Sequence, residues 1–346
     1  MTFANCVSAK ASANGIESHI ALHGIFVFDC TVENNGIGNE TGYISEIAGV
    51  RIHANNSLVT RSLIRDNGIG VLVSNSGKQV FNVTITKNAI YNNSKLGIDL
   101  ANGNDFAFRG DNVTLNDGIL NCSQPNCGMD YPVISYAEFD ESEEKLYVEG
   151  FIGDESLGSA AFANSRVEIY LVRNSTAGDN LIGNNWTLNS PLQKHYGEGF
   201  VYLGELIANS NGNFSGELSV SGKGVELNSL ITAIATLNGN TSEFGPNYFL
   251  RKKLNLSAEI TVKEMNATIK VKAFEKARNV NVYWFKPNGI EINSMSGDYS
   301  ANGSFGNFYW WKFGSINANE EKFVYLNLIG VSCFSLSDVL NIGIDP

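Results

Sequence analysis

Gly97-Ile98-Asp99-Leu100 is the last copy of a degenerate repeat that occupies the first hundred residues of the chain. Earlier copies are Gly15-Ile16-Glu17-Ser18, Gly49-Val50-Arg51-Ile52 and Gly70-Val71-Leu72-Val73, so that successive copies are 34, 21 and 27 residues apart. Side chains alternate between the two faces of a strand, and the second and fourth residues of each copy are therefore predicted to point inward. Repeats of about this length predict the stacked coils of a parallel β-helix.

A second element recurs in step with the first, as Val32-Glu33-Asn34-Asn35, Ile64-Arg65-Asp66-Asn67 and Ile90-Tyr91-Asn92-Asn93, with Val7 taken as an earlier copy. The final asparagine of each copy is predicted to stack on the next one as a corner ladder of side-chain amides. The 34-residue unit must contain an insertion, which the loop-forming residues place between Gly36 and Ile47.

This part of the chain resembles the right-handed β-helices of large secreted and surface proteins of archaea and bacteria, of the pectate-lyase-like and nitrous-oxide-accessory-like kinds. The resemblance covers about residues 15–136 and is strongest in three stretches near its end, 92–100, 111–117 and 131–134. It implies a domain at 1–130 that is a partial β-helix with a terminal cap loop. Because Thr2-Phe3-Ala4-Asn5-Cys6-Val7 resembles the middle of a coil, we expect the chain to be one piece of a longer architecture.

The pattern changes after Pro132 to longer alternating strands separated by turns, which is typical of an antiparallel sandwich. The strands expected there are 133–139, 146–152, 167–172, 200–207, 213–220, 230–237 and 242–249. Seven strands suit an immunoglobulin-like (Ig-like) domain at 131–250. The stretch from Ile231 to Phe244 resembles the last hairpin of Ig-like repeats in bacterial surface proteins.

A third unit at 254–346 follows the basic joint Arg251-Lys252-Lys253 and is predicted to be a second Ig-like sandwich. Its expected strands are 267–273, 280–284, 307–313, 322–328 and 339–344. The segment from Val280 to Glu320 resembles the conserved repeat domain of archaeal and bacterial cell-surface proteins. The fold class is therefore all-β, a β-helix followed by two sandwiches.

Composition and charge narrow the classes of partner. The net charge is -11, from 35 acidic and 24 basic residues spread along the chain, which argues against nucleic acid. No run approaches the about 18 apolar residues of a membrane helix, and no basic and apolar leader precedes Thr2. We nevertheless expect an extracellular, cell-surface location, with other copies of the chain, other surface proteins or glycans as partners.

The main reason for this location is an excess of N-x-Ser/Thr sequons. The chain has 13 of them, against about six expected by chance from its composition. Asparagine-rich turns also generate sequons, which is the alternative explanation. The expected glycosylation sites are Asn39, Asn55, Asn82, Asn92, Asn112, Asn121, Asn174, Asn185, Asn213, Asn240, Asn255, Asn266 and Asn302.

Of the five cysteines, only Cys122 and Cys127 are close enough in sequence for a local bridge, and their loop predicts a disulfide. No bridge is expected between Cys6 and Cys30, because aligning Val7 with Val32 would turn the two thiols to opposite faces of the coil.

A polysaccharide lyase or hydrolase is the rival interpretation, because the β-helix fold also carries such enzymes. A glycosidase needs two carboxyl groups about 5–9.5 Å apart. The outward rows read Glu17, Arg51, Leu72 and Asp99, and Glu33, Arg65 and Tyr91. Glutamates next to arginines predict charge pairs between neighbouring strands, and the rows contain no pair of adjacent acids. We therefore predict that the chain is not an enzyme.

Two further clusters leave alternatives open. Asp99, Asp105, Asp111 and Asp117 carry the hard oxygen ligands that suit Ca²⁺, although aspartates also simply form turns. No other cofactor is expected, and His19 and His23, four residues apart on a predicted strand, are interpreted as surface residues and not as a metal pair.

The four tryptophans, Trp186, Trp284, Trp310 and Trp311, suit either core packing or a carbohydrate-stacking platform. Trp310 and Trp311 must point to opposite faces of one strand, so at most one of them is core. The sequence as a whole predicts a structural or adhesive surface glycoprotein of a cell envelope or appendage. A glycan-binding module is the first alternative and a glycan-cleaving enzyme the second.

Overall fold

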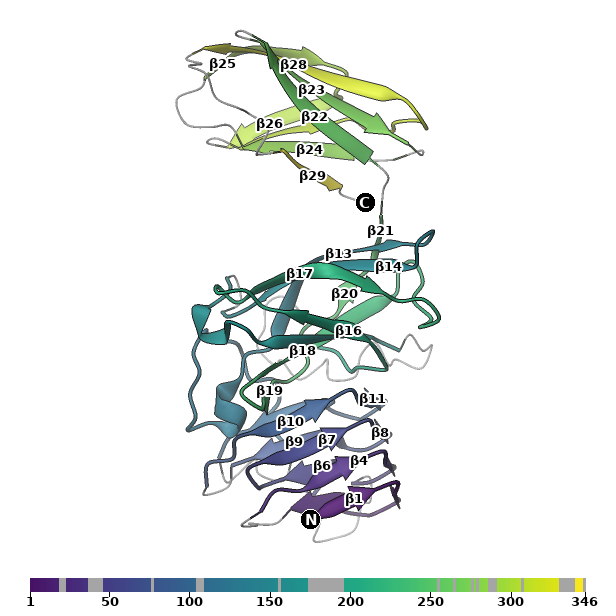
Figure 1. Ribbon diagram of the computed structural model, residues 1–346, viewed down its shortest axis with the longest axis vertical. Helices are drawn as coiled ribbons and strands as arrows, with labels where there is room; N and C mark the ends of the chain where they lie inside the picture. The colour runs from purple at the N-terminus through teal and green to yellow at the C-terminus, as the bar shows by residue number, and fades with distance from the viewer. Residues whose placement is uncertain are drawn as a thin grey trace. The chain divides into compact units, whose positions relative to one another are not determined.

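The protein is all-β and forms two compact units, Met1–Lys252 and Lys253–Pro346 (Figure 1). The structure is a computed structural model that describes residues 1–346 except 19–22, 37–45, 76–77, 104–108, 155–156, 174–195, 254–255, 264–265, 275–276, 278–279, 286–290, 306–307, 330–339 and 345–346. The insertion expected between Gly36 and Ile47 lies almost entirely outside the described residues. None of the described helices has the length or the apolar character to cross a membrane.

The first hundred residues pass through three parallel sheets in turn, four times over, so that each pass makes one coil. The first sheet contains β1 (Thr2–Ala4), β4 (Phe26–Phe28), β7 (Ser57–Thr60) and β10 (Val83–Thr86). The second contains β2 (Val7–Ala9), β5 (Thr31–Glu33), β8 (Leu63–Arg65) and β11 (Ala89–Tyr91). The third contains β3 (Ile16–Ser18), β6 (Ala48–Ile52), β9 (Ile69–Ser74) and β12 (Ile98–Ala101). This arrangement is consistent with a β-helix-like fold.

The register of these sheets confirms both repeat elements. In the third sheet Val50 pairs with Ile16 and with Val71, and Val71 pairs with Ile98. In the second sheet Ile64 pairs with Val32 and with Ile90. These apolar residues point into the coil and are at most 4% exposed, which makes the coil interior a single continuous core.

Asparagines form the predicted ladder at the corner between the second and third sheets. Asn35, Asn67 and Asn93 are fully buried. Asn35 Nδ2 donates to Asn67 Oδ1 at 3.1 Å, and Asn67 Nδ2 donates to Asn93 Oδ1 at 3.0 Å. The residue before each of them has a positive φ, which turns the chain at the corner.

The register of the first coil differs from the prediction. Ser8, not Val7, pairs with Val32, while Val7 pairs with Thr31 and is 73% exposed. Alignment on a β-branched residue was wrong here because the small Ser8 side chain takes the inward place. Cys6 and Cys30 therefore occupy equivalent positions on neighbouring coils, and the expectation that their thiols point to opposite faces is wrong.

The outward rows carry the predicted charge pairs. Arg51 forms an ion pair with Glu17, and Arg65 forms one with Glu33. The row in the third sheet is not open to solvent, because Arg51, Leu72 and Asp99 are at most 1% exposed. Asp99 is therefore buried, whereas an outward position had been expected to expose it to solvent.

A two-sheet antiparallel sandwich completes the first unit. One sheet orders β17 (Asn213–Ser219), β14 (Lys145–Ile152), β13 (Pro132–Asp140) and β21 (Arg251–Lys252), the last pairing parallel. The other orders β16 (Val201–Ile207), β15 (Arg166–Leu171), β18 (Leu230–Leu237) and β19 (Asn240–Thr241), with β20 (Tyr248–Phe249) also on β18. One apolar cluster, which includes Val148 and Ile169, joins the two sheets.

Six of the strand segments expected in this sandwich coincide with strands, but 242–249 does not. Only β19 before it and β20 within it are strands. The reason is that Glu243 is committed to hydrogen bonds with the coils, described below, which take the chain away from a continuous ladder.

The second unit is also a two-sheet antiparallel sandwich. Its sheets are β22 (Leu256–Lys263), β23 (Asn266–Ala273), β28 (Glu321–Ile329) and β25 (Glu291–Gly297), and β26 (Ala301–Phe305), β27 (Phe308–Lys312), β24 (Val280–Phe285) and β29 (Leu340–Ile344). The five expected segments are strands. Three further strands, β22, β25 and β26, were not expected from the sequence; they lie at sheet edges and are partly or largely exposed.

Candidate functional site

The last coil is joined to the first sandwich by three buried glutamates. Glu168, Glu198 and Glu243 are 0%, 4% and 2% exposed. Glu168 Oε2 accepts from the backbone N–H of Lys87 at 3.0 Å. Lys87 lies in the last coil, whose outer edge has no further coil to supply hydrogen-bond acceptors. Carboxylates from the sandwich therefore replace the acceptors of a next coil.

The other two glutamates act in the same way on the third sheet and on the ladder. Glu243 accepts from the backbone N–H of Leu100 and from that of Thr114, both at 2.9 Å. Glu198 Oε1 accepts from Asn93 Nδ2 at 2.8 Å and so ends the asparagine ladder. Each of the three glutamates thus accepts a hydrogen bond from the last coil, and Glu243 also accepts one from the segment that follows it.

The hairpin of β18 and β19 adds a second set of bonds along β10. Its turn, Asn238-Gly239, has positive φ at both residues, as a tight hairpin turn requires. Thr84 donates its hydroxyl to the Gly239 carbonyl at 2.9 Å, and Thr241 Oγ1 accepts from the Ile85 N–H at 2.9 Å. A Cβ on Gly239 would lie 1.8 Å from Asn82 Oδ1 and would have to displace that side chain, and the φ of 80° also favours glycine.

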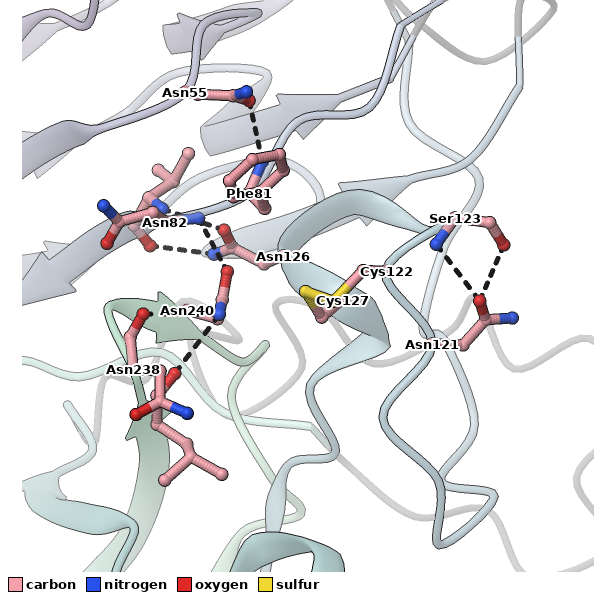
Figure 2. Close-up of a disulfide and its surroundings, with 12 residues drawn as sticks. Asn55, Phe81, Asn82, Asn121, Cys122, Ser123, Asn126, Cys127, Asn238 and Asn240 are labelled. Carbon is pink, nitrogen blue, oxygen red and sulfur yellow. Dashed lines mark hydrogen bonds between the residues drawn. A yellow bond between two sulfur atoms is a disulfide. The ribbon is translucent and has the colours of Figure 1, made fainter.

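The predicted disulfide between Cys122 and Cys127 is present and borders this junction (Figure 2). Asn126, inside the disulfide loop, is fully buried with a φ of 47°. Its Oδ1 accepts from the Val83 N–H at 3.0 Å, and its Nδ2 donates to the carbonyls of Val83 and Thr241, both at 2.8 Å. One side chain therefore ties the last coil to the hairpin of the sandwich.

A group of three carboxyls, the buried Asp99 and Glu243 and the half-buried Asp111, lies beside the third sheet. Asp99 and Asp111 lie close enough for each to act on the pKa of the other. Burial, followed by the neighbouring Asp111 charge, raises the pKa of Asp99 well above its usual range. Burial also raises the pKa of Asp111, and burial and then Asp99 raise the pKa of Glu243. These groups therefore hold protons at pH values where exposed carboxyls are ionised.

The four aspartates expected to bind calcium separate into different places. Asp99 and Asp111 are together, but Asp117 belongs with Asp130, whose Oδ1 and Oδ2 accept from the N–H groups of Asp117 and Gly118. Asp105 lies outside the described residues. Among the residues that the structure describes, no three His, Cys, Asp or Glu side chains are grouped to hold a metal ion. The described residues do not bring the predicted set together, and calcium binding by the four aspartates stays a prediction.

The sequons differ in exposure. The exposed ones are Asn121, Asn213, Asn266 and Asn302, and the half-buried ones are Asn55, Asn82, Asn92 and Asn112. Asn39, Asn174, Asn185 and Asn255 lie outside the described residues. Asn240 is only 8% exposed, and its Oδ1 accepts from the Asn82 N–H at 2.6 Å. The folded chain leaves no room for a glycan at Asn240, which corrects the expectation for that site.

Aromatic residues of the second unit divide between core and surface. Trp284 and Trp311 are buried, and Trp310 is half-buried on the opposite face, as alternation requires. The Trp310 indole lies over Gly303 of the neighbouring strand, where a Cβ would come within 2.6 Å of it. Trp186, His19 and His195 lie outside the described residues, and His23 is exposed.

Comparison with known proteins gives no family assignment. No family model matches the chain. A chitinase from Bacillus thuringiensis is 10% identical with a TM-score of 0.17, over 63% of this chain and 28% of the chitinase. A structure described as manganese lipoxygenase of Gaeumannomyces graminis and partial zonadhesin of Komagataella pastoris is 7% identical with a TM-score of 0.19, over 62% of this chain and 92% of that one. At these TM-scores the likeness assigns neither a fold family nor a function.

Proposed function

We propose that the chain is a non-enzymatic extracellular glycoprotein, a structural or adhesive component of a cell envelope or appendage. Its architecture in this proposal is a right-handed parallel β-helix followed by two Ig-like domains. The observation that carries the proposal is that the hydrogen-bond donors at the outer edge of the last coil are already occupied. In a binding protein these donors would be available to a ligand, but here they donate to Glu168, Glu198 and Glu243 of the sandwich. We expect this docking to make a rigid segment, as a structural part requires.

The sides of the coils support the same role. Ion pairs between neighbouring coils, Arg51 with Glu17 and Arg65 with Glu33, tie successive strands together. Cross-strand pairs of this kind contribute about 0.2–1 kcal/mol each. The buried asparagine ladder adds side-chain hydrogen bonds along the stack. These charged and amide side chains thus bind one another from coil to coil, which stabilises the stack.

Exposed sequons and a local disulfide support an extracellular location. Asn121, Asn213, Asn266 and Asn302 present their side chains at the surface, where a glycan can attach. The bridge between Cys122 and Cys127 is of a kind that persists in oxidising compartments.

The burial of the acid pair argues against glycan cleavage. A glycosidase needs two carboxyl groups that flank the scissile glycosidic bond. Asp99 is 1% exposed and Asp111 is half-buried, so the surrounding residues keep a sugar away from Asp99.

Two measurements test this proposal. Antibodies against the chain should label intact cells of the source organism without permeabilisation, and labelling only after permeabilisation would contradict a surface location. The purified chain, incubated with acidic and neutral polysaccharides, should release no new reducing ends or unsaturated sugars. Turnover that is lost in both Asp99→Asn and Asp111→Asn would overturn the non-enzymatic assignment.

Glycan binding is a second candidate function, which the position of Trp310 favours. Its indole lies over Gly303 on the face of the sheet away from the core, and Tyr283 is its partner on the other neighbouring strand. Aromatic planes of this kind stack on sugar rings. Trp310→Ala should abolish binding on a glycan array, whereas Tyr325→Ala, a change at a 50% exposed aromatic residue of β28, should not. Equal binding by both variants would exclude this site.

A further inference from the structure

Two cysteines lie next to each other on the first two coils. Cys6 and Cys30 precede the paired strands β2 and β5, and the Thr31 N–H donates to the Cys6 carbonyl at 2.8 Å. The Cys6 N–H donates to Cys30 Sγ at 3.4 Å, and Cys30 is close enough to raise the pKa of the Cys6 thiol. Neighbouring strands are about 4.8 Å apart, which lies within the Cα separation of about 4.4–6.8 Å that a disulfide spans.

The residues equivalent to Cys6 and Cys30 on the later coils, Ser62 and Asn88, show which side chains this corner of a coil requires. Ser62 Oγ accepts from the Cys30 N–H at 3.2 Å, and Asn88 Oδ1 accepts from the Ser62 N–H at 2.9 Å. The position therefore calls for a short side chain that accepts a backbone N–H. Sulfur is a weak acceptor, so serine or asparagine serves this purpose better than cysteine. The hydrogen bond therefore does not explain why both positions are cysteine, whereas two neighbouring thiols can also be oxidised to a disulfide.

We propose that Cys6 and Cys30 are a modification site, at which oxidation forms a disulfide that joins the first coil to the second. A disulfide-bearing thiol oxidant, such as glutathione disulfide or an oxidoreductase disulfide, supplies the oxidising equivalents. Cys6 is half-buried and Cys30 is 2% exposed, so Cys6 is the thiol that meets the oxidant.

The exchange proceeds in two balanced steps. The Cys6 thiolate attacks one sulfur of glutathione disulfide, forms a mixed disulfide and releases one glutathione thiolate. The Cys30 thiolate then attacks the Cys6 sulfur, forms the bond between Cys6 and Cys30 and releases the second glutathione thiolate. The two thiols lose two electrons and two protons, and the products are the protein disulfide and two molecules of glutathione.

The environment of the pair sets the rate of this reaction. Burial, and then the hydrogen bond with Cys30, raises the pKa of the Cys6 thiol to about 11. Only the thiolate attacks, so bond formation should be slow at neutral pH and accelerate about tenfold per pH unit towards that value. The bond would close a loop between residues 24 positions apart and restrain the first coil, which has a neighbouring coil on one side only in the described chain.

The test uses the full chain, reduced under native conditions and then treated with glutathione disulfide at alkaline pH. Peptide mapping without reduction should recover Cys6 joined to Cys30. Wild type should then melt at a higher temperature than the same protein in which these two thiols remain reduced. Cys6→Ser and Cys30→Ser are matched controls, because Ser62 fills the equivalent position, and they should fold and melt like the reduced wild type.

Recovery of Cys6 and Cys30 as alkylated free thiols after oxidation, from protein whose circular dichroism is native, would overturn the proposal. A bond from Cys6 to any other cysteine would overturn it equally. Neither outcome depends on whether the chain is a surface protein, because the oxidant is added in the experiment.

Discussion

Asn93 Nδ2 donates to Glu198 Oε1 at 2.8 Å across 105 residues of sequence. This bond connects the end of a ladder that runs along the coils to a carboxylate of the sandwich. Glu198 is 4% exposed, so the ladder ends inside the molecule and not in solvent. The bond is one of several that join two kinds of β structure, one parallel and one antiparallel, in a single compact unit.

Removing this acceptor should destabilise the first unit. Glu198→Ala leaves the buried Asn93 Nδ2 with only its 3.4 Å hydrogen bonds to the carbonyls of Ile64 and Tyr91. It also removes the acceptor of the Asn93 backbone N–H, and we expect the loss to cost about 1–3 kcal/mol in the free energy of unfolding. Urea unfolding of the full chain measures this change. Glu217→Ala is the control, because Glu217 is 47% exposed and forms a surface ion pair with Lys145, and it should cost no more than about 1 kcal/mol. Equal effects of the two substitutions would refute the role given to Glu198.

Asn126 should matter more than the disulfide that flanks it. Asn126→Ala removes three hydrogen bonds from a buried position and places alanine at a φ of 47°, which together cost about 3–5 kcal/mol. Replacing Cys122 and Cys127 by serine opens a loop of only a few residues and should cost about 2 kcal/mol. Asn121→Ala, at an exposed site in the same loop, is the control and should change stability by less than about 0.5 kcal/mol.

Stability should depend on pH through Asp130. Burial raises the pKa of Asp130 to about 7, above the 3.8 of a free aspartate. Between these values the folded chain binds more protons than the unfolded chain, so this group's contribution is complete below pH 4 and is lost as the pH rises to 7. Asp130→Asn should therefore flatten the dependence of the melting temperature on pH between 5 and 7. A slope unchanged from wild type would show that Asp130 titrates normally.

Glycan occupancy should follow exposure. Expression in a secreting, N-glycosylating host followed by glycopeptide mapping should find glycans at Asn121 and Asn213, which are exposed. Asn240 should be unmodified, because its side chain is buried against β10. A fully occupied Asn240 in natively folded protein would mean that the hairpin does not dock on the coils.

The repeat made most of the coiled part predictable. Equivalent residues recur along the chain, so the copies ending in Asn35, Asn67 and Asn93 give the register directly, and the structure confirms it. The first coil was misaligned because Val7 was matched by residue type. The better signal is the corner residue with positive φ, since Asn5 and Asp29 both precede the cysteines that stack.

The junction was not predictable in the same way. Glu168 lies in the apolar strand β15, where a charged residue signals an unusual environment, and Glu243 follows β19. Their partners Lys87 and Leu100 are 81 and 143 residues away. Nothing in the local pattern identifies such partners. The edge strands β25 and β26 were missed because their exposed residues do not alternate in polarity as strongly as those of inner strands.

The most direct measurement is hydrogen exchange of the full chain along a urea series, followed by mass spectrometry of peptides from the coils and from the first sandwich. If the buried glutamates make these parts one rigid element, peptides around Ile64, Leu100 and Ile169 should lose protection at the same urea concentration. The triple substitution of Glu168, Glu198 and Glu243 by alanine should separate the two transitions. Separate transitions already in the wild type would contradict the account, because the coils and the sandwich would then fold as independent parts.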